Sequence, residues 1–314
     1  MKKVLVTGGA GFVGINLVKY LLETRKYKVN VLDNLSSGSY QLLNQAVDEA
    51  GSEITLFQAD ILDKTDVNRI LPGYEYVVHL AAQTGVIPSQ QDPFHDAAVN
   101  ITGTLNLLDA AVENNIQKFV FASSAAPLGE QKPPLDEKKV PKPLSPYGAS
   151  KLAGEAYCSA FYHSYGLNTV GLRFSNVYGP NSLHKGSVVA LFIKKILKNE
   201  PLTVYGDGKQ TRDFLYVTDV ARVIHDILQS SDKKINGEIF QLGTGVETPV
   251  NRLVSYLRDI TGLTFEVVYK PERKGEIKRN VSSIKKIENQ LGCKPRFDLK
   301  KGLEETWRWF SANY

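Results

Sequence analysis

The stretch VLVTGGAGFVG, residues 4–14, decides the fold. A short apolar strand runs into the glycines, and a helical pattern follows them. Gly8, Gly11 and Gly14 are spaced three apart, and the overlapping set that begins at Gly9 also fits G-x-G-x-x-G. Glycine permits a tight turn, lets the backbone approach a pyrophosphate and lets the helix pack close to the strand. Because the helix then points free N–H groups at an anion, the stretch predicts a dinucleotide-binding loop.

An acidic residue in the right place supports this interpretation. Asp33 ends the second predicted strand, about 20 residues after the glycines, where a carboxylate binds a ribose 2′-hydroxyl. The same carboxylate repels a 2′-phosphate, and the next two residues, Asn34 and Leu35, supply no cation. The pattern therefore favours NAD over NADP.

Strands and helices alternate outward from this loop. We expect strands at 2–7, 27–33, 52–60, 75–82, 117–124 and 167–176, and helices at 14–24, 97–113 and 145–166. Such alternation predicts an α/β fold with a doubly wound parallel Rossmann sheet. Later segments, 217–228 and 237–243, look like one more helix and strand that return to this sheet.

The regular alternation of strands and helices ends after residue 175, where the predicted loops become longer. We expect an NAD-binding domain over 1–174, to which 213–243 returns, and a smaller C-terminal α/β lobe over 175–212 and 244–314 that binds the substrate.

Composition narrows the function classes. The chain has 314 residues, a net charge of +5 and only two cysteines, whose positions give neither a disulfide framework nor metal spacing. We expect a cytoplasmic protein with no metal, no membrane span and no nucleic-acid partner. The basic stretch 269–286 is either a solvated face or a site for a diphosphate.

A tyrosine and a lysine in SPYGASK suggest acid–base chemistry. Tyr147 and Lys151 are four residues apart on a predicted helix and share one face. A nearby ammonium favours a phenolate, so we expect Lys151 to lower the pKa of Tyr147 from about 10 by roughly three units. Tyr147 would then accept a proton from a sugar hydroxyl while hydride leaves the same carbon.

Together these motifs resemble a known family. The glycine loop, Asp33, HLAA at 79–82, Tyr147 with Lys151, and LRFSNVYGP at 172–180 resemble the extended short-chain dehydrogenase/reductases. More narrowly, the chain is similar to the NAD-dependent epimerase/dehydratase family, especially its UDP-glucose 4-epimerases.

The resemblance implies roles for individual residues. The catalytic residues it implies are Ser124, Tyr147 and Lys151. The NAD-binding residues it implies are Gly8, Gly11, Phe12, Val13, Gly14, Asp33, Asn34, Asp60, Ile61, Leu80, Ala81, Ala82, Gln83, Asn100, Ser123, Tyr147 and Lys151. The residues it implies for the UDP-sugar are Gln83, Ser124, Tyr147, Asn176, Ser187, Val188, Tyr205, Arg212, Arg273, Glu276 and Asn280.

Two alanines favour one reaction within the family. Relatives that dehydrate the sugar carry an Asp-Glu pair after the catalytic serine or threonine, and decarboxylases usually carry a Glu at the second place. Ala125 and Ala126 occupy these positions here, and alanine transfers no proton. We therefore expect a UDP-sugar 4-epimerase that acts through a transient 4-keto intermediate. The alternatives are a UDP-glucuronate 4-epimerase, another dehydratase, decarboxylase or reductase of the family, and a non-catalytic dinucleotide sensor.

The sugar itself is less well defined. Counting along the family pattern places Asn280 beside C2 of the sugar, where a bulky tyrosine would exclude N-acetyl groups; we therefore expect UDP-GlcNAc and UDP-GalNAc to be accepted beside UDP-glucose and UDP-galactose. Thr84 and Ser89 could instead bind a uronic-acid carboxylate. Leu128 stands where the family usually has tyrosine, which predicts a roomier or drier wall near the sugar.

Members of this family commonly dimerise through a four-helix bundle. Here the bundle would use 94–115 and 147–165, with apolar residues at 101, 105, 108 and 112. Core packing explains these apolar residues equally well.

Overall fold

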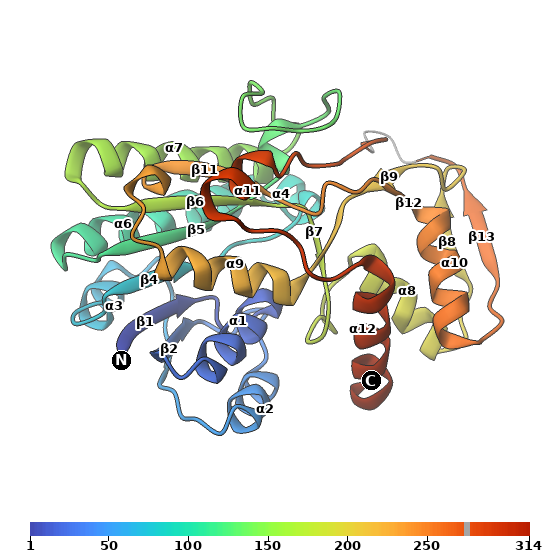
Figure 1. Ribbon diagram of the computed structural model, residues 1–314, viewed down its shortest axis with the longest axis horizontal. Helices are drawn as coiled ribbons and strands as arrows, with labels where there is room; N and C mark the ends of the chain where they lie inside the picture. Colours follow the sequence, from blue (N-terminus) through green and yellow to red (C-terminus); the bar gives the residue numbers. More distant parts are fainter. Residues whose placement is uncertain (273–276) are drawn as a thin grey trace.

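The structure is a computed structural model that describes residues 1–272 and 277–314. The predictions for Arg273 and Glu276 lie outside the described residues. The chain forms a large α/β group and a smaller group beside it (Figure 1).

A parallel sheet of seven strands forms the centre of the large group, in the order β11-β6-β5-β4-β1-β2-β3. Its strands are β1 (Lys2–Thr7), β2 (Tyr27–Asp33), β3 (Leu56–Gln58), β4 (Tyr76–His79), β5 (Lys118–Ser124), β6 (Thr169–Phe174) and β11 (Glu238–Leu242). The order reverses between β1 and β4, and in such sheets ligands bind at the carboxyl ends of the strands where the order reverses. The expected Rossmann fold class is confirmed.

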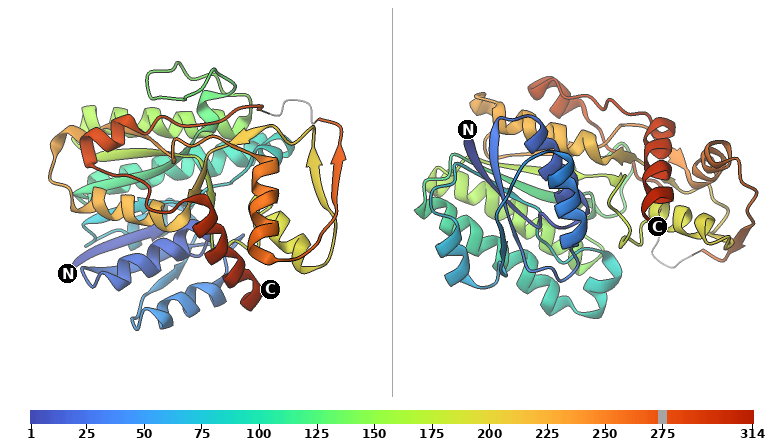
Figure 2. Two further views of the ribbon diagram at one scale, coloured as in Figure 1. Left: turned by 45° about the vertical axis from the view of Figure 1, so that its right-hand side comes forward. Right: turned by 90° about the horizontal axis from the view of Figure 1, so that it is seen from below.

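Helices cover both faces of the sheet, as Figures 1 and 2 show. They are α1 (Phe12–Glu23), α2 (Tyr40–Glu49), α3 (Lys64–Ile70), α4 (Val86–Gln91), α5 (Pro93–Ala97), α6 (Gly103–Glu113), α7 (Pro146–Tyr165), α9 (Val217–Gln229) and α11 (Lys285–Leu291). Alternate residues of one strand serve the two faces: Val4 and Val6 pack in the core with α1, α2 and α9, while Leu5 packs with α3, α6 and α7. This alternation explains why the strands are apolar throughout.

The predicted helix over 97–113 is divided. It begins as α5, continues as a π-helical turn at Ala98–Thr102 and becomes α6 at Gly103. π-Turns are rare overall, and those that do occur are often found at functional sites. The turn carries Asn100, one of the predicted cofactor-binding residues.

The smaller group has its own core. Its elements are β8 (Leu202–Tyr205), β9 (Thr211–Arg212), β12 (Thr248–Pro249), β13 (Val267–Lys270), α8 (Val188–Leu197), α10 (Val250–Thr261) and α12 (Leu299–Asn313). β7 (Asn176–Tyr178) pairs in parallel with β10 (Phe214–Tyr216) where the two groups meet. Phe192, Leu253 and Phe310 are fully or almost fully buried between α8, α10 and α12.

Among the described residues, no helix combines the length and the apolar character that crossing a bilayer requires.

Candidate functional site

The glycine loop has the geometry of a phosphate cradle. Gly8 has φ +70°, and a Cβ built there would lie 2.5 Å from the Ala81 main-chain nitrogen. A Cβ on Gly14 would overlap the Gly8 carbonyl oxygen. Gly11 is the N-cap of α1, and among the described residues no side chain caps this end, so the first N–H groups of the helix have no side-chain acceptor. These residues fit the pyrophosphate of NAD.

The acids at the ends of β2 and β3 lie beside this cradle. Asp33 is buried and accepts hydrogen bonds from the main-chain nitrogens of Ala10 and Leu35, both at 2.9 Å. Burial raises the pKa of Asp33, and these two hydrogen bonds oppose the rise. The Asn34 amide donates to Asp60 at 2.9 Å, which links two predicted NAD-binding residues at the ends of neighbouring strands.

The segment after β4 closes the cradle from the other side. Leu80 and Ala81 donate main-chain hydrogen bonds to Thr7, which ends β1. Gln83 exchanges two hydrogen bonds with the Asn100 amide, at 2.9 and 3.0 Å. The structure thus brings the predicted residues of this segment and of the π-helical turn together.

A buried histidine braces this segment. His79 lies between the hydroxyls of Thr7, at 2.8 Å, and Thr104, at 3.0 Å. Burial, with a smaller contribution from the charge of Lys151, lowers the pKa of His79 to about 3. The imidazole is therefore neutral at physiological pH and acts as a rigid spacer.

The three predicted catalytic side chains meet at the carboxyl end of β5. Ser124 ends the strand and its side chain hydrogen-bonds Tyr147. Tyr147 lies in the first turn of α7, and Lys151 follows one turn later. The Lys151 ammonium donates to the Ala122 main-chain oxygen at 2.9 Å and lies 5.0 Å from the centre of the Phe121 ring.

The expected low pKa of Tyr147 is wrong for the protein without cofactor. Burial raises the pKa of Tyr147 to about 12, and the negative charge of Asp96 adds to the rise. Burial also lowers the pKa of Lys151 to about 8, against the pull of nearby Asp96. Desolvation is the largest cause of both shifts because both groups lie inside the protein. A phenolate at neutral pH therefore needs further positive charge.

Ser123, a predicted cofactor-binding residue, differs from its neighbour in what its side chain contacts. Its hydroxyl is buried and donates to Glu155 at 2.5 Å. Arg173, opposite Ser123 in the β5–β6 pairing, holds the same carboxylate with two hydrogen bonds at 2.8 and 2.7 Å. Glu155 lies on α7 one turn beyond Lys151, so the Ser123 hydroxyl is engaged between β5 and α7 inside the protein. Sequence reasoning missed Glu155, although Tyr147, Lys151 and Glu155 are spaced by four along α7.

A second group that sequence reasoning missed lies where α5 packs on α7. Asp96 is fully buried, and its Oδ1 accepts from the Asn100 amide at 3.0 Å. The same amide nitrogen lies 3.1 Å from the Ser150 hydroxyl, and the Ser150 side chain lies near enough to Asp96 to favour its carboxylate form. No spacing in the sequence indicates this contact between α5 and α7.

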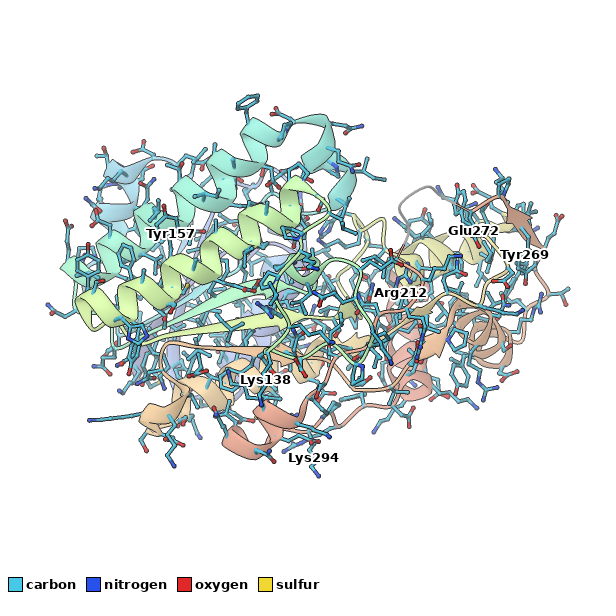
Figure 3. All side chains as sticks on the ribbon, turned by 90° about the horizontal axis from the view of Figure 1, so that it is seen from above. Lys138, Tyr157, Arg212, Tyr269, Glu272 and Lys294 are labelled. Atoms are coloured by element: carbon cyan, nitrogen blue, oxygen red, sulfur yellow. The ribbon has the colours of Figure 1, made fainter. Side chains whose placement is uncertain are left out.

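The predicted nucleotide contacts are spread over the smaller group. Asn176 begins β7, and Arg212 lies between the two groups, whereas Tyr269 and Glu272 lie at the far end (Figure 3). Arg212 donates to the main-chain oxygens of Thr211 and Ile277, both at 2.8 Å. Ser187 and Val188 lie at the start of α8, and Tyr205 ends β8.

One carboxylate joins these segments. Asp213 is fully buried and accepts four hydrogen bonds from Thr244, Gly245 and Ser282, at 2.6 to 3.2 Å. Its own main-chain oxygen accepts from the nitrogen of Asn176 at 2.9 Å. The segment that carries Asn280 is thereby tied to β7 and to the chain beside Arg212.

The loop after β5 reaches the same segment. Leu135 forms an isolated parallel β-bridge with Ser282. Its main-chain nitrogen donates to the Val281 oxygen, and its main-chain oxygen accepts from the Ser283 nitrogen. Asn280 is partly buried, and its Oδ1 has no hydrogen-bond partner among the residues that the structure describes.

Two expectations about the sugar pocket are corrected. Leu128 is fully buried, so it belongs to the core beneath the loop and does not form the wall predicted beside the sugar. Ser89 is also fully buried and donates to the Val86 main-chain oxygen, so its hydroxyl is not free for a carboxylate. Thr84, by contrast, lies 3.5 Å from the ammonium of Lys185, which comes from the loop before α8.

Comparisons with known proteins agree with this geometry. Residues 4–243 match the NAD dependent epimerase/dehydratase family. A putative UDP-glucose 4-epimerase of Methanocaldococcus jannaschii is 41% identical over 315 residues, covering 99% of both chains. The structure of a UDP-N-acetylglucosamine 4-epimerase from Methanobrevibacter ruminantium, in complex with UDP-N-acetylmuramic acid, is similar with a TM-score of 0.92 at 36% identity, covering 100% of this chain and 99% of that one.

A third similar protein was solved with the cofactor. It is a variant of the UDP-glucuronic acid 4-epimerase of Bacillus cereus in complex with a fluorinated UDP-glucuronic acid and NAD, with a TM-score of 0.92 at 32% identity over 99% of this chain and 100% of that one. These findings confirm the resemblance, the NAD cofactor and the class of nucleotide-sugar epimerases expected from the sequence. The chain belongs to the NAD-dependent epimerase/dehydratase family.

Proposed function

We propose that the protein is a UDP-sugar 4-epimerase that interconverts UDP-glucose and UDP-galactose and also accepts UDP-GlcNAc and UDP-GalNAc. The observation that carries this proposal is the meeting of Ser124, Tyr147 and Lys151 at the end of β5, with Ala125 and Ala126 directly after it. The trio suits oxidation at C4, and the two alanines remove the groups that dehydration or decarboxylation would use.

Each residue of the trio has a defined task in this proposal. Ser124 binds the C4 oxygen and hydrogen-bonds Tyr147, which takes the hydroxyl proton and later returns it. Lys151 supplies positive charge beside Tyr147. Bound NAD supplies a nicotinamide that accepts hydride from C4 and gives it back. The 4-keto sugar turns between these two events, so the hydride returns to its other face.

The nucleotide half of the substrate needs cationic and polar groups. Arg212 offers a planar fork of donors suited to a diphosphate, and Asn176 lies next to the same junction. We propose that Ser187, Val188 and Tyr205 surround the base, and that Asn280 lies beside C2 of the sugar.

A uronic-acid substrate is the second candidate. Lys185 is half-buried, and its ammonium faces Thr84 across the junction of the two groups. Among the described residues no carboxylate forms an ion pair with it, so an anionic sugar substituent would find a cation there. Lys185→Met should then abolish turnover of UDP-glucuronate and leave UDP-glucose turnover within a few-fold.

A panel of UDP-sugars with product identification by NMR tests the proposal. The C4 epimer of UDP-glucose or UDP-GlcNAc is the expected product; a 4-keto-6-deoxy sugar or a pentose would overturn it. Tyr147→Phe should abolish epimerisation while NAD stays bound. Tightly held NAD in the purified protein separates an epimerase from a dehydrogenase that releases its cofactor in each cycle.

We also propose a homodimer formed by helices within 94–115 and 147–165. Phe94 is 86% exposed and Tyr157 is 37% exposed on the outer side of α7 (Figure 3), which suits an interface. Leu108 is fully buried in the core and is not available for it. Sedimentation of wild type and Phe94→Glu tests the dimer.

The division into two domains and the cytoplasmic location of the protein are also proposals. We propose the NAD-binding domain at 1–174 with 213–243 and the substrate lobe at 175–212 with 244–314, although Ile287 of α11 packs in the larger core. Both cysteines are buried and free, which suits a reducing cytoplasm.

A further inference from the structure

The active site contains a buried carboxylate that the proposed reaction does not use. Asp96 lies in α5, has no exposed surface, and is joined to the Asn100 amide at 3.0 Å, which in turn lies 3.1 Å from the Ser150 hydroxyl. Its second oxygen, Oδ2, has no hydrogen-bond partner among residues 1–272 and 277–314. A buried carboxylate with an unused acceptor is costly, so such a group calls for an explanation.

Its surroundings place this carboxylate next to the catalytic turn of α7. Ser150 lies between Tyr147 and Lys151 in the sequence, and its hydroxyl donates to the Tyr147 main-chain oxygen at 3.1 Å. Asn100 reaches from the π-helical turn to both Ser150 and Asp96. A single network therefore connects α5, the π-helical turn and the first turns of α7.

The charged groups around this network are few. Asp96 interacts electrostatically with Lys151 and Tyr147 on α7 and with His95 on its own helix. Lys151 is also influenced by Glu155 and Cys158 of α7, and it influences His79 of β4. Glu155 is held by Arg173, so Asp96 is the acidic group of this set without a cationic hydrogen-bond partner in the described part of the chain.

We propose that Asp96 is a positioning residue of the active site, which holds the Tyr147 turn through Asn100 and Ser150 and supplies the negative charge that keeps Lys151 an ammonium. The inference rests on the proposed roles of Tyr147 and Lys151. In consequence Asp96 sets the pH range in which the enzyme works.

The direction of the effect follows from the signs of the charges. A negative carboxylate disfavours the Tyr147 phenolate and favours the Lys151 ammonium, so it raises the pKa of both groups. Activity needs the phenolate and the ammonium together, so Tyr147 defines the acidic limb of the pH profile and Lys151 the basic limb. Removing the charge of Asp96 lowers both pKa values and moves both limbs to lower pH.

The first experiment is the pH profile of kcat/KM for Asp96→Asn in the NAD-loaded enzyme. We expect both limbs to move down by about one pH unit, the size typical of the loss of one nearby charge. Asp96→Glu, which keeps the charge, should restore the position of the limbs. Asp109→Asn is the matched control, because it removes an acid that pairs with Lys64 on the surface, and its profile should match wild type. Limbs that stay in place for Asp96→Asn overturn the proposal, even if kcat falls.

The second experiment needs no sugar. Tyrosinate absorbance is titrated in the NAD-loaded protein, and the contribution of Tyr147 is obtained by subtracting the Tyr147→Phe counterpart in the wild-type and Asp96→Asn backgrounds. A midpoint about one pH unit lower in Asp96→Asn supports the proposal, and equal midpoints overturn it. If the asparagine is not accommodated, Asp96→Ser repeats the test with a smaller neutral side chain. Since this titration does not depend on the substrate, a wrong choice of sugar and a wrong role for Asp96 are told apart.

Discussion

Lys151 donates a hydrogen bond from α7 to the main-chain oxygen of Ala122 on β5, 2.9 Å away. The contact fixes the ammonium between the sheet and the helix that carries Tyr147. It also buries a positive charge, since only 3% of Lys151 is exposed. The protein therefore keeps a group at its active site that destabilises the fold.

Lys151→Met should make the cofactor-free protein more stable and the enzyme inactive. Burial lowers the pKa of Lys151 from 10.5 to about 8. Below pH 8 the lysine is charged in both states, so the folded state carries the full cost of about 3 kcal/mol. Methionine removes this cost but leaves the Ala122 oxygen without its donor, so we expect a net gain of about 1–2 kcal/mol at pH 7 and a loss of activity of at least about 100-fold.

Urea unfolding at several pH values checks the sign of this effect. Wild-type stability should rise relative to Lys151→Met between pH 8 and 10.5, because the folded protein loses the proton before the unfolded chain does. A constant difference across that window would contradict the argument.

Glu155→Gln should destabilise the protein strongly. The carboxylate is buried and joins Ser123 to Arg173, so its loss leaves the guanidinium buried without its counter-charge, which typically costs about 3–5 kcal/mol. Ser123→Ala removes one hydrogen bond and should cost about 1–2 kcal/mol. Chemical denaturation measures both. The exposed pair Lys64–Asp109 is the control, and its removal should cost less than about 1 kcal/mol.

Asp213→Ala should raise KM for the UDP-sugar more than it lowers kcat. Its carboxylate orders Thr244, Gly245 and Ser282, which hold the Asn280 segment, but no predicted catalytic side chain bonds to it. We expect KM to rise about tenfold or more, with NAD affinity unchanged. Steady-state kinetics and NAD titration separate the two effects, and an equal loss in kcat with unchanged KM would argue against this role.

Asn280→Tyr should narrow the substrate range. Asn280 is partly buried on a segment bridged to the loop after β5. If it lies beside the sugar, as we propose, a tyrosine ring at this position would occupy space there. We expect UDP-GlcNAc turnover to fall about 100-fold while UDP-glucose turnover changes only a few-fold, because a buried clash costs on the order of 2–3 kcal/mol. Asn280→Ser serves as the control, and unchanged selectivity in the tyrosine variant would refute the assignment.

Short-range patterns predicted the parts of the site that lie close together in the sequence. Gly8 and Gly14 are six residues apart, and Tyr147 and Lys151 are four apart, so local geometry alone brings each pair together. Asp96 and Ser150 are 54 positions apart and meet only because α5 packs on α7. No periodic pattern in the sequence indicates that contact.

Buried groups were also harder to predict than exposed ones. The sequence suggested that Lys151 lowers the pKa of Tyr147. The spacing of the two residues reveals the nearby ammonium, but it does not reveal how much water the folded protein removes from around the phenol. The structure shows that burial dominates and raises the pKa of Tyr147 to about 12. Ser89 and Leu128 failed as pocket residues for a related reason, since only packing decides which side of a loop faces the core.

The sequence by itself determined the Rossmann sheet and the NAD cofactor, because strand alternation and glycine spacing are local properties of the chain. Helical period placed Tyr147 and Lys151 on one face, whereas the role predicted for Ser124 came from the resemblance to the family. The tertiary structure alone decided that Ser123 faces Glu155, that Asp96 reaches the Tyr147 turn and that Asp213 ties the smaller group to β7. These contacts depend on which helix packs against which strand, and on how much water that packing removes.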